Sequence, residues 1–313
     1  MQEEFPPEVI TVLKKVPLLI LSLVVLLAFT ACGGAKIDGS SDGMLAVSVT
    51  FDALGEFAKA VGGDKVAVSV IIPTGTDPHD FEPKAQDLVG LSSADVFVYN
   101  GLGMESWATD AVSAANNEKL IAVDASTGAD VIENTGEGVI AERGQYDPHL
   151  WLGIKGAETE VTNIKNAFVQ ADPANKAYYE ANAKSYIDQL EALYNDYSAK
   201  FAAVEKKSFV TGHAAFGYLC RDFGLTQNSV EDVFAEGEPS AQQLAELVDY
   251  CRQNGVTTIF AEEMASPEIS QTLANEVGAS VKTIYTMESA EDGLSYLERM
   301  TDNLSEIYDA LSK

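Results

Sequence analysis

The sequence is poor in histidine and in positive charge. Its 313 residues include three histidines, and 20 lysines and arginines stand against 48 aspartates and glutamates, which gives a formal net charge of −28. A chain with this charge repels nucleic acid and anionic lipid, so neither is expected as a partner. The negative surface attracts cations in general, but salt screens that attraction beyond about 8 Å, so charge alone identifies no binding site.

Two enzyme motifs are also absent. The chain contains no His-Glu-x-x-His metalloprotease motif and no phosphate-binding loop. It has no tandem repeat of the solenoid kind. Its length exceeds what one hydrophobic core usually supports, about 250–300 residues, and this predicts two domains.

Residues 1–31 are predicted to be a lipoprotein signal peptide. Two lysines precede an apolar run from Val16 to Ala28, which is too short for a membrane span of about 20 residues. Small residues then precede Cys32, as in the lipobox of bacterial lipoproteins. An uncleaved anchor helix is the alternative, and either one tethers the protein outside the cytoplasmic membrane. The Gly- and Ser-rich residues 32–43 are expected to be a flexible tether.

The other two cysteines permit a disulfide but do not require one. If Cys32 carries lipid, Cys220 and Cys251 remain. A disulfide between them would close a loop of about thirty residues and contribute about 3–4 kcal/mol to stability. Two buried free thiols are the equally favoured alternative. Neither cysteine is expected to bind metal, because each lies in a helical pattern away from the histidines.

Strand and helix patterns alternate along the chain, which predicts α/β domains with parallel sheets covered on both faces. In the first half we expect strands at 44–51, 65–72, 96–99 and 120–123, and helices at 53–61, 83–92 and 107–115. In the second half we expect strands at 207–211, 257–261 and 280–285, and helices at 214–223, 240–253, 266–277 and 294–311.

One long helix is predicted between the two halves. From Pro173 to Val204, apolar and aromatic residues recur at steps of three and four, the pattern of one helix about 48 Å long. Such a helix exceeds the width of one domain, so we expect it to connect two lobes; a helical hairpin inside one domain is the alternative. The expected lobes are residues 44–171 and 205–313, with the linking helix at 172–204.

The three histidines lie in loops that follow predicted strands. His79 and His149 both stand in Asp-Pro-His, and His213 follows Thr-Gly. A single histidine in such a place is more often a hydrogen-bonded loop or core residue than a metal ligand. Three imidazoles together suit a borderline cation such as zinc, and they leave a fourth position for a carboxylate or water. The sequence therefore predicts a metal site.

Four segments resemble the signature motifs of the cluster A-I solute-binding proteins, the zinc- and manganese-binding lipoproteins that serve ATP-driven metal importers. They are Pro78–Pro83, Asp147–Leu152, Gly212–Leu219 and Ile259–Glu262. The resemblance implies two Rossmann-like α/β lobes joined by one long rigid helix, with the metal in the cleft between them. It also implies an extracytoplasmic protein, anchored to the bacterial cell membrane by lipid on Cys32, that hands its metal to an ABC-type permease. We expect a monomer.

The resemblance also implies which residues hold the metal. His79 and His149 would be ligands from the N-terminal lobe, and His213 from the C-terminal lobe. An acid from the loop after the last strand would complete the site, and Glu288 stands at that position. The alternatives for this fourth position are the two acids at the end of another strand, Glu262 and Glu263.

Two aspartates accompany the Asp-Pro-His motifs. Asp77 and Asp147 could each accept the second ring N–H of a ligand histidine, or could start an Asp-Pro turn, and the turn is the favoured interpretation. Four aromatic residues in or near the motifs are expected to pack around the site and keep it dry, rather than to form a cage for an organic cation: Phe81, Trp151, Phe216 and Tyr218.

The ligand set favours zinc over manganese. Three imidazoles and one carboxylate suit tetrahedral zinc, whereas manganese prefers more oxygen ligands and is the alternative. Residues 126–146 are acidic and hold no histidine, so the His-rich loop of the family's zinc branch is missing. A zinc-dependent hydrolase is the rival function; it would need an activated water at the fourth position, which a bound Glu288 would occupy.

Overall fold

The computed structural model describes residues 43–134, 145–231, 240–263, 268–289 and 292–313. The expected signal peptide, Cys32 and nearly all of the tether lie outside these residues. Residues 135–144 of the acidic segment 126–146 also lie outside them. Within the described ranges, no helix combines the length and apolar character needed to cross a bilayer. All of these residues belong to one compact unit, Ser40–Lys313.

The first lobe is built on a parallel sheet of four strands with the order β2-β1-β3-β4. Its strands are β1 (Leu45–Val49), β2 (Val66–Val70), β3 (Val96–Tyr99) and β4 (Ile121–Asp124). Its helices are α2 (Asp52–Gly62), α3 (Ala108–Ala115) and α5 (Ile154–Ala171). The central strands β1 and β3 are rich in buried valine, as expected for parallel strands with both faces covered.

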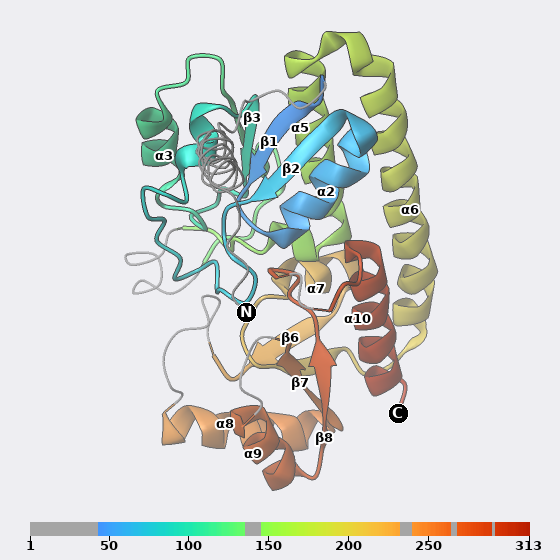
Figure 1. The fold of residues 1–313 in the computed structure, drawn as a ribbon. Helices are drawn as coiled ribbons and strands as arrows, with labels where there is room; N and C mark the ends of the chain where they lie inside the picture. The colour runs from blue at the N-terminus through green and yellow to red at the C-terminus, as the bar shows by residue number, and fades with distance from the viewer. Residues whose placement is uncertain (1–42, 135–144, 232–239, 264–267, 290–291) are drawn as a thin grey trace, which may run out of the picture. The chain divides into compact units, whose positions relative to one another are not determined.

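The second lobe repeats this plan, with the parallel strand order β6-β5-β7-β8 (Figure 1). Its strands are β5 (Ser208–Thr211), β6 (Thr226–Ser229), β7 (Thr258–Glu262) and β8 (Ser280–Ile284). Its helices are α7 (Gly217–Phe223), α8 (Ala241–Asn254), α9 (Glu268–Val277) and α10 (Tyr296–Leu311). The predicted fold class, two Rossmann-like α/β lobes, is confirmed.

A single helix connects the two lobes. Helix α6 (Lys176–Ala203) follows a short 3-10 turn, Pro173–Asn175, and is one unbroken element of 28 residues rather than a hairpin. It packs against α2 and α5 of the first lobe and against α7 and α10 of the second (Figure 1). The side chains that it buries recur at steps of four and seven: Tyr179, Ala183, Leu190, Tyr197 and Phe201.

One predicted helix is largely wrong. Residues 83–92 form a 3-10 turn at Val89–Ser92 and otherwise run irregularly. The backbone N–H of Asp87 donates to the carbonyl of Lys84 at 2.9 Å and the Asp87 carboxylate accepts the Lys84 N–H at 2.7 Å, so the two residues close a turn on each other. Helix α5 and strand β6, in contrast, were not predicted from the sequence.

The two cysteines of the second lobe are free thiols. Cys220 of α7 and Cys251 of α8 are both buried, but in different apolar clusters, so the disulfide alternative is not formed. Burial raises the pKa of the Cys251 thiol to about 11 and that of Cys220 further still.

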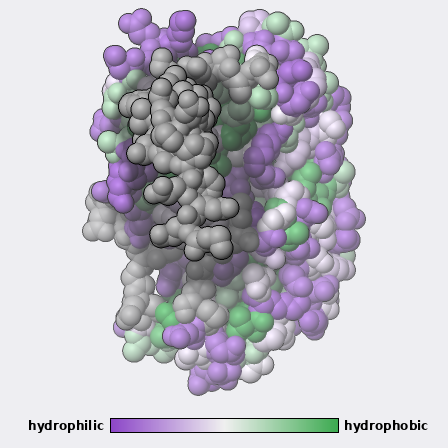
Figure 2. Space-filling view, in the orientation of Figure 1, coloured by the Kyte–Doolittle hydropathy of each residue, from purple (hydrophilic) through white to green (hydrophobic). Residues whose placement is uncertain are grey.

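On the face shown in Figure 2, hydrophilic side chains predominate among the described residues, in keeping with the high acid content.

Candidate metal centre

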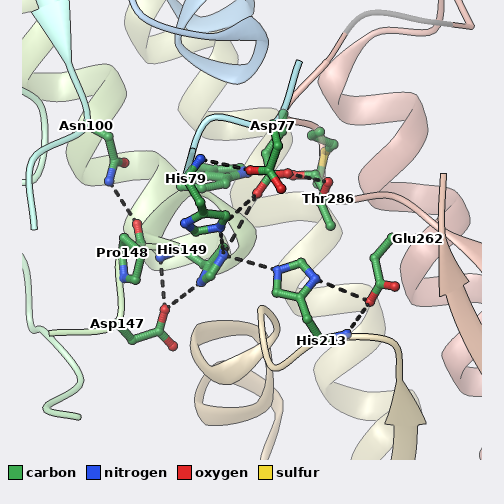
Figure 3. A network of polar contacts seen from close by, with 12 residues as sticks. Asp77, His79, Asn100, Asp147, Pro148, His149, His213, Glu262 and Thr286 are labelled. Carbon is green, nitrogen blue, oxygen red and sulfur yellow. Dashed lines mark hydrogen bonds and ion pairs between the residues drawn. The ribbon is translucent and has the colours of Figure 1, made fainter. Parts of the chain in front are cut away.

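Three imidazoles and one carboxylate converge between the two lobes. One possible ligand atom from each of His79, His149, His213 and Glu288 lies within 4.8 Å of the others. The Nε2 atom of His149 is 3.1 Å from that of His79 and 3.3 Å from that of His213 (Figure 3). The Oε1 atom of Glu288 is 3.6 Å from His79 Nε2 and 3.8 Å from His149 Nε2.

Four of the six separations lie close to those in the coordination shell of zinc, and all six are within 4.8 Å. Ligand atoms at about 2.0–2.1 Å from a tetrahedral zinc ion lie about 3.3 Å from one another. The site also contains an open acceptor, because Glu288 Oε1 is buried and has no hydrogen-bond partner. A cation at the centre would satisfy this oxygen. The four residues therefore fit a tetrahedral divalent ion.

The topology explains why residues so distant in sequence meet. His79 follows β2 and His149 lies in the segment after β4, both in the first lobe. His213 follows β5 and Glu288 follows β8, both in the second lobe. Loops at the carboxyl ends of parallel strands gather at one edge of each sheet, and here these two edges face each other across the site.

Asp147 combines both roles that the sequence left open. Its Oδ1 atom accepts the backbone N–H of His149 at 2.9 Å, as in an Asp-Pro turn, and also lies 2.9 Å from His149 Nδ1 (Figure 3). The second contact fixes the ring with Nε2 directed at the site. Burial raises the pKa of Asp147 to about 7. Asp77 performs the turn role: its Oδ1 accepts the backbone N–H of His79 at 2.8 Å.

Glu262 supports His213 and does not join the four converging residues. Its Oε1 atom accepts the backbone N–H of His213 at 3.0 Å and lies 3.6 Å from Nδ1 of the same ring. Gly212 makes this approach possible, because a Cβ atom there would lie 1.9 Å from Glu262 Oε2. Burial lowers the pKa of His213, but the hydrogen bond and charge of Glu262, with the charge of Glu288, outweigh it and raise that pKa to about 9.

Of the three candidate acids, Glu288 is the one that the structure brings to the imidazoles. Its Oε2 atom accepts the Thr286 hydroxyl at 3.2 Å. Burial, opposed by the charge of His213 and reinforced by Asp77 and Glu263, raises the pKa of Glu288 to about 8. Glu263 instead accepts hydrogen bonds from the backbone N–H groups of Thr286 and Met287.

Two of the aromatic residues that were expected to pack also make polar contacts. Trp151 Nε1 donates to the carbonyl of Thr286 at 2.7 Å, which joins a first-lobe residue close to His149 to the loop of Glu288. The Tyr218 hydroxyl donates to the carbonyl of Asp147 at 2.7 Å. Neither bond could be predicted from the sequence, because the partners are 135 and 71 residues away.

Comparison with known proteins identifies the family of this chain. Residues 47–310 match the family model described as ZnuA, zinc-uptake complex component A periplasmic. A Treponema pallidum (strain Nichols) protein named for metal binding is 47% identical over 277 residues, which is 86% of this chain and 88% of that protein. The high-affinity zinc uptake system protein ZnuA of Bacillus subtilis (strain 168) is 37% identical over 300 residues, 91% of this chain and 94% of that protein.

A solved structure shares the fold. The zinc(II)-bound form of an AdcAII variant from Streptococcus pneumoniae superposes with a TM-score of 0.79 at 32% identity, over 87% of this chain and 100% of the other. The family match covers both lobes, and the family is one of substrate-binding proteins for zinc transport rather than of enzymes, which sets the hydrolase alternative aside. The chain belongs to the ZnuA family of zinc-uptake binding components.

Proposed function

We propose that this protein captures Zn²⁺ with His79, His149, His213 and Glu288 and delivers it to the permease of an ABC-type metal importer. The observation that carries the proposal is the spacing of the four donor atoms, which is 3.1–3.8 Å for four of the six pairs and within 4.8 Å for all of them, close to that of a tetrahedral zinc shell. The family's role in zinc uptake supports it.

The donor set favours zinc over manganese. Manganese prefers octahedral oxygen-rich sites, whereas this site offers three imidazoles and one carboxylate. Four neighbouring acids could add oxygen ligands, but each already accepts backbone N–H bonds: Asp77, Asp147, Glu262 and Glu263. A manganese ion would have to recruit water or break these bonds to complete six ligands.

The location proposed for the protein is extracytoplasmic. The apolar run that ends near Cys32 supports a signal peptide and a lipid anchor on that cysteine, and we propose that the anchored protein acts as a monomer. Mass spectrometry of protein from the membrane fraction tests this: loss of residues 1–31 with a lipid-sized mass on Cys32 is expected. An intact N-terminus, or an unmodified cysteine, would contradict it.

Metal analysis of the purified protein tests the central proposal. Protein prepared without added metal is expected to contain about one zinc ion per chain by elemental analysis. In competition, zinc should displace manganese, and manganese in excess should not displace zinc. Stoichiometric manganese in the isolated protein, or equal competition, would overturn the choice of zinc; binding of neither metal would overturn the site.

A further inference from the structure

The turn that delivers Glu288 has an unusual backbone. Met287, directly before Glu288, has a φ of 60°, which residues other than glycine rarely adopt, and its side chain is fully buried. Such a conformation costs free energy and persists only where surrounding contacts impose it. Contacts with surrounding residues therefore hold this turn in the conformation that brings the carboxylate of Glu288 to the imidazoles.

Glu263 binds the backbone of this turn. Its carboxylate accepts the backbone N–H of Thr286 at 2.9 Å and that of Met287 at 3.1 Å. The Thr286 hydroxyl lies 3.3 Å from Glu263 Oε1 and 3.2 Å from Glu288 Oε2, so it can donate its one proton to either acid. Trp151 binds the carbonyl of Thr286 from the other lobe at 2.7 Å. One acid therefore grips both N–H groups of the strained turn.

The position of β7 lets two adjacent acids serve two different loops. Strand β7 lies between β5 and β8, so its carboxyl end lies between the His213 loop and the Glu288 loop. Successive side chains of a strand leave it in opposite directions. Glu262 accordingly binds the backbone of His213, and Glu263 binds the backbone of Thr286 and Met287.

We propose that Glu263 is a positioning residue for metal capture, which holds the Thr286–Met287 turn in the conformation that directs Glu288 Oε1 at the metal. The inference rests on the proposed function, because it assumes that Glu288 binds the ion. Without Glu263, the turn relaxes to an unstrained backbone and Glu288 contributes no more than a water molecule would. The whole effect of Glu263 on zinc affinity therefore passes through Glu288.

A double-mutant cycle on zinc affinity, measured by competition calorimetry, tests this coupling. Glu263→Ala is expected to weaken zinc binding by nearly the same factor as Glu288→Ala. The variant with both changes should bind no more weakly than Glu288→Ala alone. Glu263→Gln, which keeps one acceptor oxygen, should show an intermediate loss and serves the same cycle if Glu263→Ala does not fold.

Glu262→Ala is the matched control. It removes an acid of the same size from the neighbouring position, but it acts on His213 and not on the Thr286–Met287 turn, so it should weaken binding further when Glu288 is already replaced. If the effects of Glu263→Ala and Glu288→Ala also multiply, or if Glu263→Ala leaves affinity unchanged, the positioning role is wrong. If Glu288→Ala itself leaves affinity unchanged, the proposed ligand set fails instead, so the two failures are distinguishable.

Discussion

At the scale of single residues, the site depends on four side chains that each offer one ligand atom. We expect His79→Ala, His149→Ala and His213→Ala each to weaken zinc binding more than tenfold in calorimetry, since each removes one of four ligands. Glu288→Ala should cost less, because water can take its place. Glu276→Ala removes an exposed acid from α9 and should leave affinity unchanged. If any two of the histidine variants kept their affinity for zinc, the proposed metal site would be wrong.

Protons compete with zinc for the same atoms. In the metal-free protein the pKa of His213 is about 9 and that of Glu288 about 8, so at pH 7 both hold protons that zinc must displace. The free site therefore binds more protons than the loaded site, and zinc affinity should rise as pH increases from 6 to 8. Calorimetry in buffers of different ionisation enthalpy should show release of about one to two protons at pH 7. An affinity independent of pH would contradict the two raised pKa values.

The four converging side chains could be predicted from the sequence more fully than the residues that hydrogen-bond to them and to their loops. His79, His149 and His213 stand in recognisable motifs, Glu288 stands where the family resemblance implies an acid, and the structure brings all four together. The roles of Trp151 and Tyr218 as hydrogen-bond donors could not be predicted, because an aromatic residue in a motif looks the same whether its polar atom has a partner or not. The division of work between Glu262 and Glu263 likewise depends on which loops flank β7.

At the scale of elements, periodicity predicts most strands and helices, and α5 carries a helical pattern as well. The buried residues of that helix recur at steps of three and four from Ile154 through Ala157, Val161 and Ile164 to Phe168, the pattern of a helix with one buried face. Strand β6 reads Thr-Gln-Asn-Ser and lies at the edge of its sheet, so it carries no apolar alternation that could predict a strand. Helix propensity in 83–92 gave way to a local turn.

The buried face of α5 also carries an acid without a partner. Glu160 is fully buried and neither carboxylate oxygen has a hydrogen bond. Burial, with smaller contributions from the charges of Glu105 and Asp124, raises the pKa of Glu160 well above its usual value. The folded protein thus keeps a proton that the unfolded chain loses above about pH 4.3, so this group costs stability increasingly as pH rises past that value.

Replacing this acid with an apolar side chain should stabilise the protein. Glu160→Met is expected to raise the free energy of unfolding by about 1–3 kcal/mol at pH 7.5, since it removes a buried polar group that has no hydrogen bond. Urea unfolding at pH 5 and pH 7.5 measures the gain, which should be larger at the higher pH. Glu180→Met on the exposed face of α6 should change stability by less than about 0.5 kcal/mol. A loss of stability in Glu160→Met would show that the carboxyl group has a favourable role.

At the scale of the whole molecule, a buried ion pair ties the two lobes together. Arg299 of α10 is 1% exposed, and its guanidinium lies 2.7 Å from Asp52 of α2 in the other lobe. It also donates to Asp292 from Nε at 2.9 Å. The backbone N–H of Asp52 in turn donates to the carbonyl of Glu288 at 3.3 Å, so this tie lies beside the metal centre.

Breaking this pair should be costly, because Asp52 would remain buried without its partner charge. We expect Arg299→Met to lower the free energy of unfolding by about 3–5 kcal/mol in urea titration. Arg252→Met removes a solvent-exposed ion pair with Glu276 and should cost less than about 1 kcal/mol. Similar losses in both variants would show that the buried pair contributes no more than a surface pair.

The fluorescence of Trp151 is expected to report metal binding because of the position of this residue. The chain has two tryptophans, and the indole of Trp151 lies 5.3 Å from the ring of His149, whereas Trp107 packs against Phe81 and Phe97. A divalent charge arriving at His149 changes the electric field across the nearer indole and should shift its fluorescence. An unlabelled sample should thus report zinc uptake through its own emission, with the signal kept in Trp107→Phe and lost in Trp151→Phe.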